Sequence, residues 1–439
     1  MAPVQREAGG LQRRLGAIDA AAIVISNVIG GGIFFVPVIV AQLVPRPSAL
    51  LGAWLAGGAL AFAGAMAYAE LGAMRPHAGG EYVYIRDAYG PLAAFLTGWT
   101  SFIAGFSGAI AASAVALAGY VVHFLPLDPR ARTTVALVAV IAFTLVHVRG
   151  LGPGRFLQNL LALLKVSAIV ILVAAGFAAA RGNAANFAAG SHATAVGWGL
   201  ALVPVMFTYS GWNAAAYVAG EVRDPHRNVP LSLALGTIAV VLLYLALNAL
   251  FLYAMPVSRL ASVPGGSLMD TVAQHLFGSA GGDLLAIFAL ISIAASISAM
   301  VLAGPRVYYA MARDGLFVRS AGHVHPRFHT PAAAIVAQGA WSCILVLSGT
   351  LSQLVAYTGF AVVLFAGIAV SAVFVLRRRI PDDPRPFRAL GYPWAPAIFV
   401  MASAAMVVNE IWRDPGPALT GIALIAAGIP VYLLARRQD

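Results

Sequence analysis

The stretch IGGGIFFVP, residues 29–37, interrupts the first long apolar segment of this chain. Three consecutive glycines lie near the middle of a run long enough to cross a membrane, and Pro37 follows shortly after them. Each glycine destabilises a helix by about 1 kcal/mol relative to alanine, so the stretch predicts a helix that unwinds here. The alternative interpretation is close packing between helices, which small residues allow in membranes. Three adjacent glycines favour unwinding.

A second interruption, FTYSGWN at residues 207–213, lies at the middle of the sixth apolar segment. Interruptions in the first and sixth segments predict two inverted five-helix repeats, at about 15–180 and about 197–377, followed by two further helices at about 393–435. We expect a single transmembrane domain over residues 1–436. Carriers built in this way bind substrate at the membrane midplane, between the unwound segments.

The composition also indicates a membrane protein. Hydrophobic residues make up 61% of the 439 residues, charged residues only 10%, and the mean hydropathy is +0.86, which excludes an ordinary soluble domain. The net charge of +11 lies in short loops between apolar segments, so we expect no nucleic-acid partner. Because no phosphate-binding loop, dinucleotide fingerprint or nucleophile elbow occurs, we expect neither an enzyme nor a cofactor.

We predict twelve membrane spans, and the arginines alternate with them. The spans cover roughly residues 17–44, 48–73, 89–121, 133–149, 155–179, 197–221, 229–255, 284–312, 331–349, 351–376, 393–412 and 416–435. All but one of the 27 basic residues are arginines, and 20 of these fall on the side that holds both chain ends. The other six are Arg46, Arg130, Arg132, Arg181, Arg259 and Arg413. Because positive loops stay in the cytoplasm, we expect both termini there and the chain in the inner membrane, surrounded by lipid.

The two interruptions suit the charged groups of an α-amino acid. At the start of a second half-helix, N–H groups without intrahelical partners carry the positive end of the helix dipole and can bind a carboxylate. These groups belong to Gly31, Gly32 and Ile33, directly after Gly30. Carbonyls at the end of a first half-helix can accept from an α-ammonium. The candidates are Val28, Ile29, Phe207 and Ser210, directly before Gly211.

Two asparagines, Asn213 and Asn248, are uncharged polar residues at membrane depth. Each either lines the pocket for the substrate side chain or bridges helices, and both interpretations stay open. Gly31 and the alanines at 214–216 leave room for a small side chain. His323, His325 and His329 lie in an arginine-rich loop without acidic or cysteine ligands, so we expect no metal site.

Lys165 is the only lysine of the chain, and it lies within the apolar run 160–173. An ionisable side chain near the middle of a membrane helix costs about 3 kcal/mol or more, and it marks a functional site that faces protein or water. A snorkelling lysine is the alternative. In that alternative the ammonium must reach the lipid headgroups. Lys165 lies about 15 Å from the start of its span, at 1.5 Å per residue, and this distance favours a functional site.

The ordered motifs of this chain resemble those of amino acid–polyamine–organocation (APC) permeases, in particular a prokaryotic member of the L-amino-acid transporter branch. GGGIF at 30–34 is similar to the first-helix G-S-G-I-F motif of that family. Further matching stretches are AYAELG at 67–72, GGEYVY at 79–84, YSGWN at 209–213, NVP at 228–230 and ARDG at 312–315. The resemblance implies a LeuT-type fold and sodium-independent amino acid transport.

The resemblance also implies roles for four residues. Lys165 matches a fifth-helix lysine whose ammonium substitutes for the sodium ion of coupled relatives, which places it against carbonyls between Ser26 and Ile29 and against Ser296. Phe207 matches an aromatic residue that closes over substrate, with a core phenylalanine as the alternative. Tyr357 on the tenth span is a candidate outer gate.

Two departures from the family pattern matter. The serine of the first-helix motif is Gly31 here, which removes a hydroxyl and widens that end of the site. The loop 123–132 has no cysteine, so we expect no disulfide-linked heavy chain.

We therefore predict an amino acid carrier that works by alternating access and exchanges small neutral L-amino acids. A permanently charged Lys165 suits exchange, whereas a lysine that releases its proton during the cycle suits proton symport. An amine or polyamine antiporter is the more distant alternative.

Overall fold

The fold is taken from a computed structural model. It describes residues 10–126, 128–188, 190–264, 268–278, 281–348, 351–413 and 415–436, and for 351–358 and 436 only the course of the helix. These residues are helical apart from turns, loops and one isolated parallel bridge between Leu15 and Val222.

The first half of the chain forms α1 Ala17–Val28, η1 Gly31–Phe34, α2 Val36–Leu43, α3 Pro47–Met74, α4 Glu81–Tyr89, α5 Pro91–Thr100, η2 Ser101–Gly105, α6 Phe106–Val121, α7 Pro129–Val148, α8 Leu151–Ala178 and η3 Ala184–Phe187. The second half forms α9 Ala195–Tyr209, α10 Ala214–Tyr217, η4 Ala219–Glu221, α11 Pro225–Ala254, α12 Val257–Ala261, α13 Leu268–Phe277, α14 Gly281–Ala303, α15 Pro305–Arg313, η6 Arg319–Gly322, α16 Ala332–Ser348, α17 Leu351–Arg379, α18 Trp394–Arg413 and α19 Pro415–Arg436.

These bounds follow the predicted spans closely. Within the described ranges, nine helices or continuous helix pairs are long and apolar enough to cross a membrane. The three remaining predicted spans correspond to the broken segments α1–η1–α2 and α9–α10–η4, and to the 17-residue α16. The chain is therefore a multi-pass membrane protein, as its composition indicates.

Both predicted interruptions are present. The first helix ends at Val28, and a short 3₁₀ turn begins at Gly31. The sixth-span helix ends at Tyr209, after which Ser210 is extended with ψ 145° and Gly211 has φ +97°. A positive φ is strained for a residue with a Cβ, so the glycine permits the sharp change of direction here.

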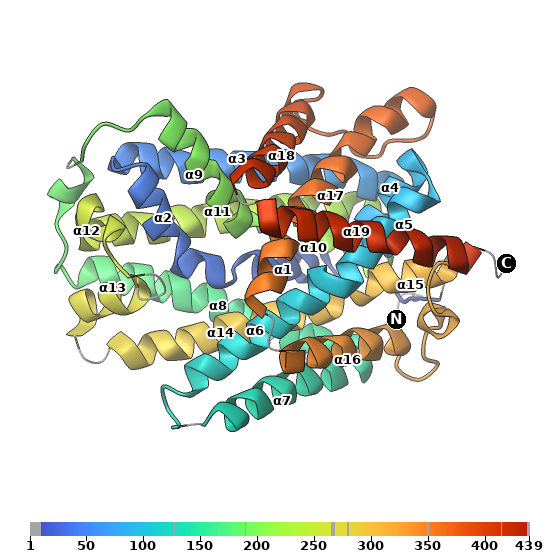
Figure 1. The fold of residues 1–439 in the computed structure, drawn as a ribbon, viewed down its shortest axis with the longest axis horizontal. Helices are drawn as coiled ribbons and strands as arrows, with labels where there is room; N and C mark the ends of the chain where they lie inside the picture. The colour runs from blue at the N-terminus through green and yellow to red at the C-terminus, as the bar shows by residue number, and fades with distance from the viewer. Residues whose placement is uncertain are drawn as a thin grey trace.

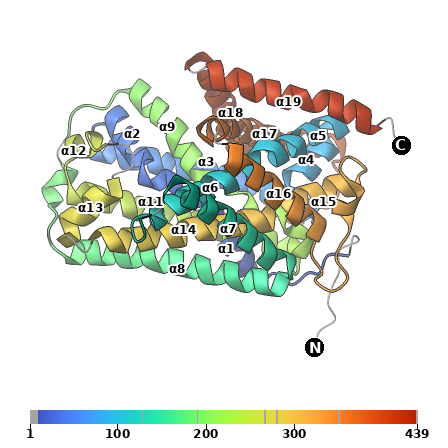
Figure 2. The ribbon, with the colours of Figure 1, turned by 60° about the horizontal axis from the view of Figure 1, so that its bottom comes forward.

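The two broken segments lie at the centre of the bundle (Figure 1). Helix α1 packs against α8, α11 and α14, whereas α3 packs against α11 and α9. Helices α18 and α19 lie on one side of the bundle, and α8 runs along the opposite side (Figure 2). Helices α4 and α15 lie toward the same end of the molecule in both views, and we call this end the α4 end.

Candidate functional site

The structure brings the two interruptions into direct contact. The Asn27 side chain, in the last turn of α1, donates from Nδ2 to the carbonyl oxygen of Gly211 at 3.4 Å. A Cβ added to Gly211 would lie 2.6 Å from that nitrogen, and one added to Gly32 would lie 3.1 Å from the Thr208 hydroxyl. Glycine at both positions therefore allows the backbones to approach closely.

Tyr244 of α11 joins the same two segments. Its hydroxyl lies 3.0 Å from the carbonyl oxygen of Val28 and 3.1 Å from that of Thr208. The side chain is fully buried and packs against Trp54 and Tyr209. The sequence analysis did not identify this residue, because a tyrosine in an apolar helix is typical of core packing. Its position one turn before Asn248 was the available signal.

Lys165 of α8 lies at the end of the first half-helix. Its Nζ donates to the carbonyl oxygens of Ser26 at 3.0 Å and Ile29 at 2.5 Å, and contacts the Ser296 hydroxyl at 3.1 Å. An ammonium has three donors and no acceptor, so these three oxygens satisfy it. Lysine and serine are both buried, which links α1 to α8 and α14 through one polar cluster.

The carbonyls at the first interruption are less available than expected. The Val28 carbonyl accepts from the Gly30 N–H as well as from Tyr244. The Ile29 carbonyl accepts from Lys165 and Ser296. Both carbonyls are therefore already engaged by donors of the protein in this arrangement. On the sixth span, the Phe207 carbonyl accepts from the Ser210 N–H.

Open space adjoins the glycine stretch. Gly31 is exposed, and a Cβ added to it would meet no atom within 4 Å. Gly30 and Gly32 are half-buried, whereas Ile33 is buried. Phe207 is 37% exposed and lies close to Gly359 of α17. The alanines at 214–216 are fully buried in the core, so of the residues expected to leave room only Gly31 borders open space.

A pocket lies beside the sixth-span interruption. Its walls are formed by residues of the interruption, of α17 and of α18. Ser210, Gly211 and Asn213 line it together with the apolar residues Met206, Trp212, Val362, Val363, Ala366, Phe399, Ala402 and Met406, and with Ser403. Among the described residues that line it, none is charged. This surface therefore suits an uncharged group.

The two asparagines have different surroundings. Asn213 Nδ2 lies 3.0 Å from the Tyr217 hydroxyl and 3.4 Å from Glu81 Oε2. Asn248 is fully buried, and its side chain donates to the Tyr244 carbonyl at 2.8 Å. Asn213 thus lies in the linker of the sixth span, whereas Asn248 lies on α11, one turn after Tyr244. The side chain of Tyr357 lies outside the described residues.

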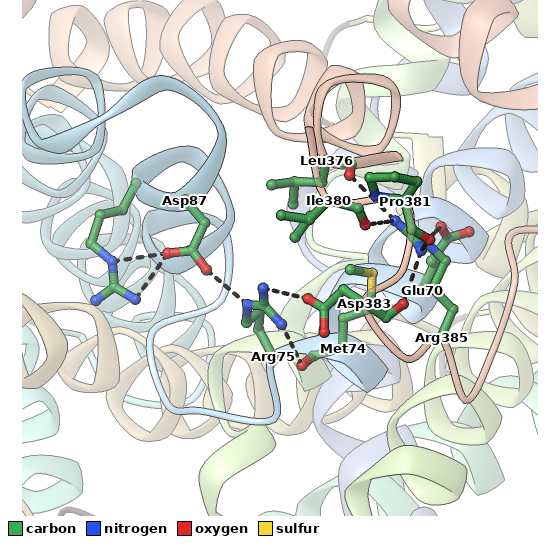
Figure 3. Close-up of polar contacts among 10 residues, drawn as sticks. Glu70, Met74, Arg75, Asp87, Leu376, Ile380, Pro381, Asp383 and Arg385 are labelled. Atoms are coloured by element: carbon green, nitrogen blue, oxygen red, sulfur yellow. Dashed lines mark hydrogen bonds and ion pairs between the residues drawn. The ribbon is translucent and has the colours of Figure 1, made fainter. Parts of the chain in front are cut away.

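Ion pairs join the end of α3 to α4 and to the loop that follows α17 (Figure 3). Arg75, at the end of α3, bridges Asp87 of α4 at 2.9 Å and Asp383, after α17, at 2.6 Å. Beside them, Glu70 of α3 pairs with Arg377 of α17 at 2.6 Å, and Arg385 lies 3.6 Å from its other oxygen.

A buried ion pair also links the sixth and eighth predicted spans. Arg306 contacts both oxygens of Glu221, with a shortest distance of 2.7 Å. The Glu221 carbonyl accepts from the N–H groups of Arg14 and Leu15, both at 2.9 Å. The segment before α1 is thereby attached to the end of the sixth span.

Two paired broken helices, one buried lysine and many apolar helices are the features of a carrier, and comparison with known proteins agrees. The family model for amino acid permeases matches residues 15–435. The chain belongs to the amino acid permease family. This confirms the resemblance read from the motifs.

Individual relatives cover nearly the whole permease. It is 29% identical to the serine/threonine exchanger SteT of Bacillus subtilis, over 97% of each chain. It is 28% identical to the human cystine/glutamate transporter, over 98% of this permease and 87% of the relative. The mouse b(0,+)-type amino acid transporter 1 is also 28% identical, over 97% of the permease and 88% of the relative.

Proposed function

We propose that this permease is a sodium-independent carrier that exchanges small neutral L-amino acids by alternating access. The observation that carries the proposal is the position of the Lys165 ammonium on the carbonyls of Ser26 and Ile29. Carbonyls at the end of a broken helix are the ligands that a coupling cation uses in such carriers. A lysine bound there supplies the positive charge covalently, so transport needs no dissolved sodium.

The proposed architecture is a LeuT-type fold of twelve spans in a single domain, residues 1–436. Its repeats are about 15–180 and about 197–377, with the final pair of helices at about 393–435. The contact between Asn27 and Gly211 supports it, because the two interruptions of an inverted repeat should meet at the midplane. The arginine distribution supports an inner-membrane location with both termini cytoplasmic.

Exchange is supported by the relatives and by the nature of the bound cation. The names of two relatives describe a serine/threonine exchanger and a cystine/glutamate transporter. A covalently attached cation cannot be released with the substrate. Transport is therefore not coupled to the gradient of such a cation. After releasing its substrate, the carrier would then change back to its original orientation only when loaded with another amino acid.

A neutral substrate is supported by the surroundings of the linker. The pocket beside Ser210 and Gly211 has no charged lining residue among those described. The open space at Gly31 is the place where a carboxylate would meet the N–H groups of Gly31 and Gly32. We expect no enzymatic activity, metal or cofactor. With Cys343 as its single cysteine, the permease is also expected to have no disulfide-linked heavy chain.

Proton symport is the second candidate. In the described surroundings of Lys165 the hydrogen-bond partners are carbonyls and a hydroxyl, not a carboxylate. A buried ammonium without a counter-charge is costly, and releasing its proton would remove that cost.

The test uses purified permease in liposomes, either empty or preloaded with L-serine, and a panel of labelled amino acids. Exchange requires uptake into preloaded liposomes only, unchanged when potassium replaces sodium. Uptake into empty liposomes driven by external acid would establish symport instead. Amine uptake without amino acid uptake would contradict both.

A further inference from the structure

Glu81, the first residue of α4, has unusual surroundings for a carboxylate in this protein. Its Oε2 accepts from the Tyr68 hydroxyl at 2.9 Å, and Asn213 Nδ2 lies 3.4 Å away. The Tyr217 hydroxyl, which accepts from Asn213 Nδ2 at 3.0 Å, lies beside the carboxylate. The residue is half-buried, and these neighbours are neutral groups from α3, from the sixth-span linker and from α10.

Six other carboxylates pair with arginine among the described residues. Asp19 lies 3.6 Å from Arg155, and closer pairs involve Glu70, Asp87, Glu221, Asp314 and Asp383. In the described part of the chain, no arginine, lysine or histidine forms an ion pair with Glu81. Burial raises the pKa of Glu81, and the hydroxyls of Tyr68 and Tyr217 act in the opposite direction. The printed hydrogen-bond partners of the carboxylate are therefore neutral side chains in the described part of the chain.

The two tyrosines beside this carboxylate pack against further aromatic rings. The ring of Tyr68 lies 5.4 Å from that of Tyr84 and 4.9 Å from that of Trp212, and Tyr217 lies 5.2 Å from Phe106. Aromatic faces attract ammonium groups, and the attraction increases when water is excluded. A carboxylate among tyrosines therefore has the chemistry of an ammonium site.

The position of Glu81 relates it to the substrate path. Asn213, its neighbour, belongs to the linker that follows Ser210 and Gly211. The loop before α4 is attached to α10 by the Gly79 N–H, which donates to the Tyr217 carbonyl at 3.1 Å. Because Lys165 and Tyr244 engage the carbonyls of Ile29 and Val28, an ammonium leaving the linker needs another acceptor.

We propose that Glu81, with Tyr68 and Tyr217, forms a second binding site for the α-ammonium of the amino acid, between the sixth-span linker and the α4 end. The inference rests on the proposed function. The site holds the substrate transiently as it enters or leaves at the α4 end, after the central linker has released it.

The first test compares the two faces of the unchanged permease. Liposomes with permease of one orientation, selected by side-specific labelling, exchange labelled L-serine in the presence of n-propylamine or propionate. We expect n-propylamine to inhibit when added at the α4 end and to inhibit far less at the opposite face, and propionate to inhibit at neither. Equal inhibition by the amine at both faces would overturn the proposal.

The second test uses Glu81→Gln, which keeps the shape and removes the charge. We expect the half-saturation concentration of L-serine at the α4 end to rise about tenfold, the equivalent of losing one hydrogen bond to a charged group. The value at the opposite face should stay within about twofold. Glu81→Asp should restore much of the affinity. Asp314→Asn is the matched control, because Asp314 is already paired with Arg86.

The outcomes separate this site from the proposed function. Unchanged half-saturation at the α4 end in Glu81→Gln would overturn the site while exchange itself stands. A lost pH dependence with unchanged half-saturation would make Glu81 a proton site instead. If the unchanged permease exchanged neither L-serine nor any other amino acid, that result would contradict the proposed function itself.

Discussion

The ammonium nitrogen of Lys165 lies 2.5 Å from the carbonyl oxygen of Ile29, the residue that caps the first half-helix. Ser296 contacts the same carbonyl from α14. The end of α1 is thus held by side chains from two other helices. When α1 moves, these hydrogen bonds must either break or move with it. The position of the half-helix is therefore coupled to the lysine.

Replacing Lys165 should impair transport without preventing the protein from folding. In Lys165→Ala, the carbonyls of Ser26 and Ile29 lose their charged donor but keep the Ser296 hydroxyl within hydrogen-bond distance. We expect exchange to fall at least about tenfold, while expression and monodispersity change little. Ser296→Ala removes one partner and keeps the ammonium, so its loss should be smaller. Exchange at the unchanged rate in Lys165→Ala would refute the role of the lysine.

Tyr244→Phe should weaken the link between the two interruptions. The variant keeps the ring and removes the hydroxyl that contacts the carbonyls of Val28 and Thr208. We expect a stability loss of about 1–3 kcal/mol, measured by thermal unfolding in detergent, and a clear drop in exchange. Tyr209→Phe is the control, because that hydroxyl donates to the Trp54 carbonyl at 3.1 Å and joins no two broken segments. Equal exchange defects in the two variants would argue against a specific role for the Tyr244 bridge.

Adjacent glycines should respond differently to substitution. Gly31→Ser places a side chain in open space, so thermal stability should be retained while the half-saturation concentration for amino acids changes, most for bulky ones. Gly32→Ala forces a Cβ to within 3.1 Å of Thr208, and we expect about 1–3 kcal/mol of destabilisation from overpacking. The pair is measured by thermal unfolding and by uptake. A stability loss in Gly31→Ser as large as in Gly32→Ala would contradict this difference in surroundings.

The buried pair of Glu221 and Arg306 should be essential to stability. Glu221→Gln leaves the guanidinium of Arg306 buried without its counter-charge, and we expect a loss of about 3–5 kcal/mol. The double variant Glu221→Gln with Arg306→Met removes both charges and should be more stable than Glu221→Gln alone. Thermal unfolding of the three proteins decides this, and a double variant less stable than the single one would disprove the explanation.

Local composition was sufficient to locate the main elements. The glycines at 30–32 and the stretch at 207–213 predicted the two interruptions, because the cost of glycine in a helix depends on the backbone itself. The apolar runs similarly predicted helix bounds that differ from the observed ones by only a few residues. The depth of Lys165 could be predicted in the same way, since it follows from the rise per residue of its own helix.

Contacts between distant segments could not be derived from such local signals. The carbonyls of Val28 and Ile29 were expected to accept from a substrate ammonium, and the family resemblance placed Lys165 near them, but the sequence did not predict that Tyr244 of α11 engages Val28. Glu81 is 132 positions away from Asn213, and only the tertiary fold, in which the loop before α4 contacts Tyr217 of α10, makes them neighbours. The sequence states which groups can hydrogen-bond, whereas the arrangement of the helices determines which lone pairs are already used, because each carbonyl oxygen has only two of them.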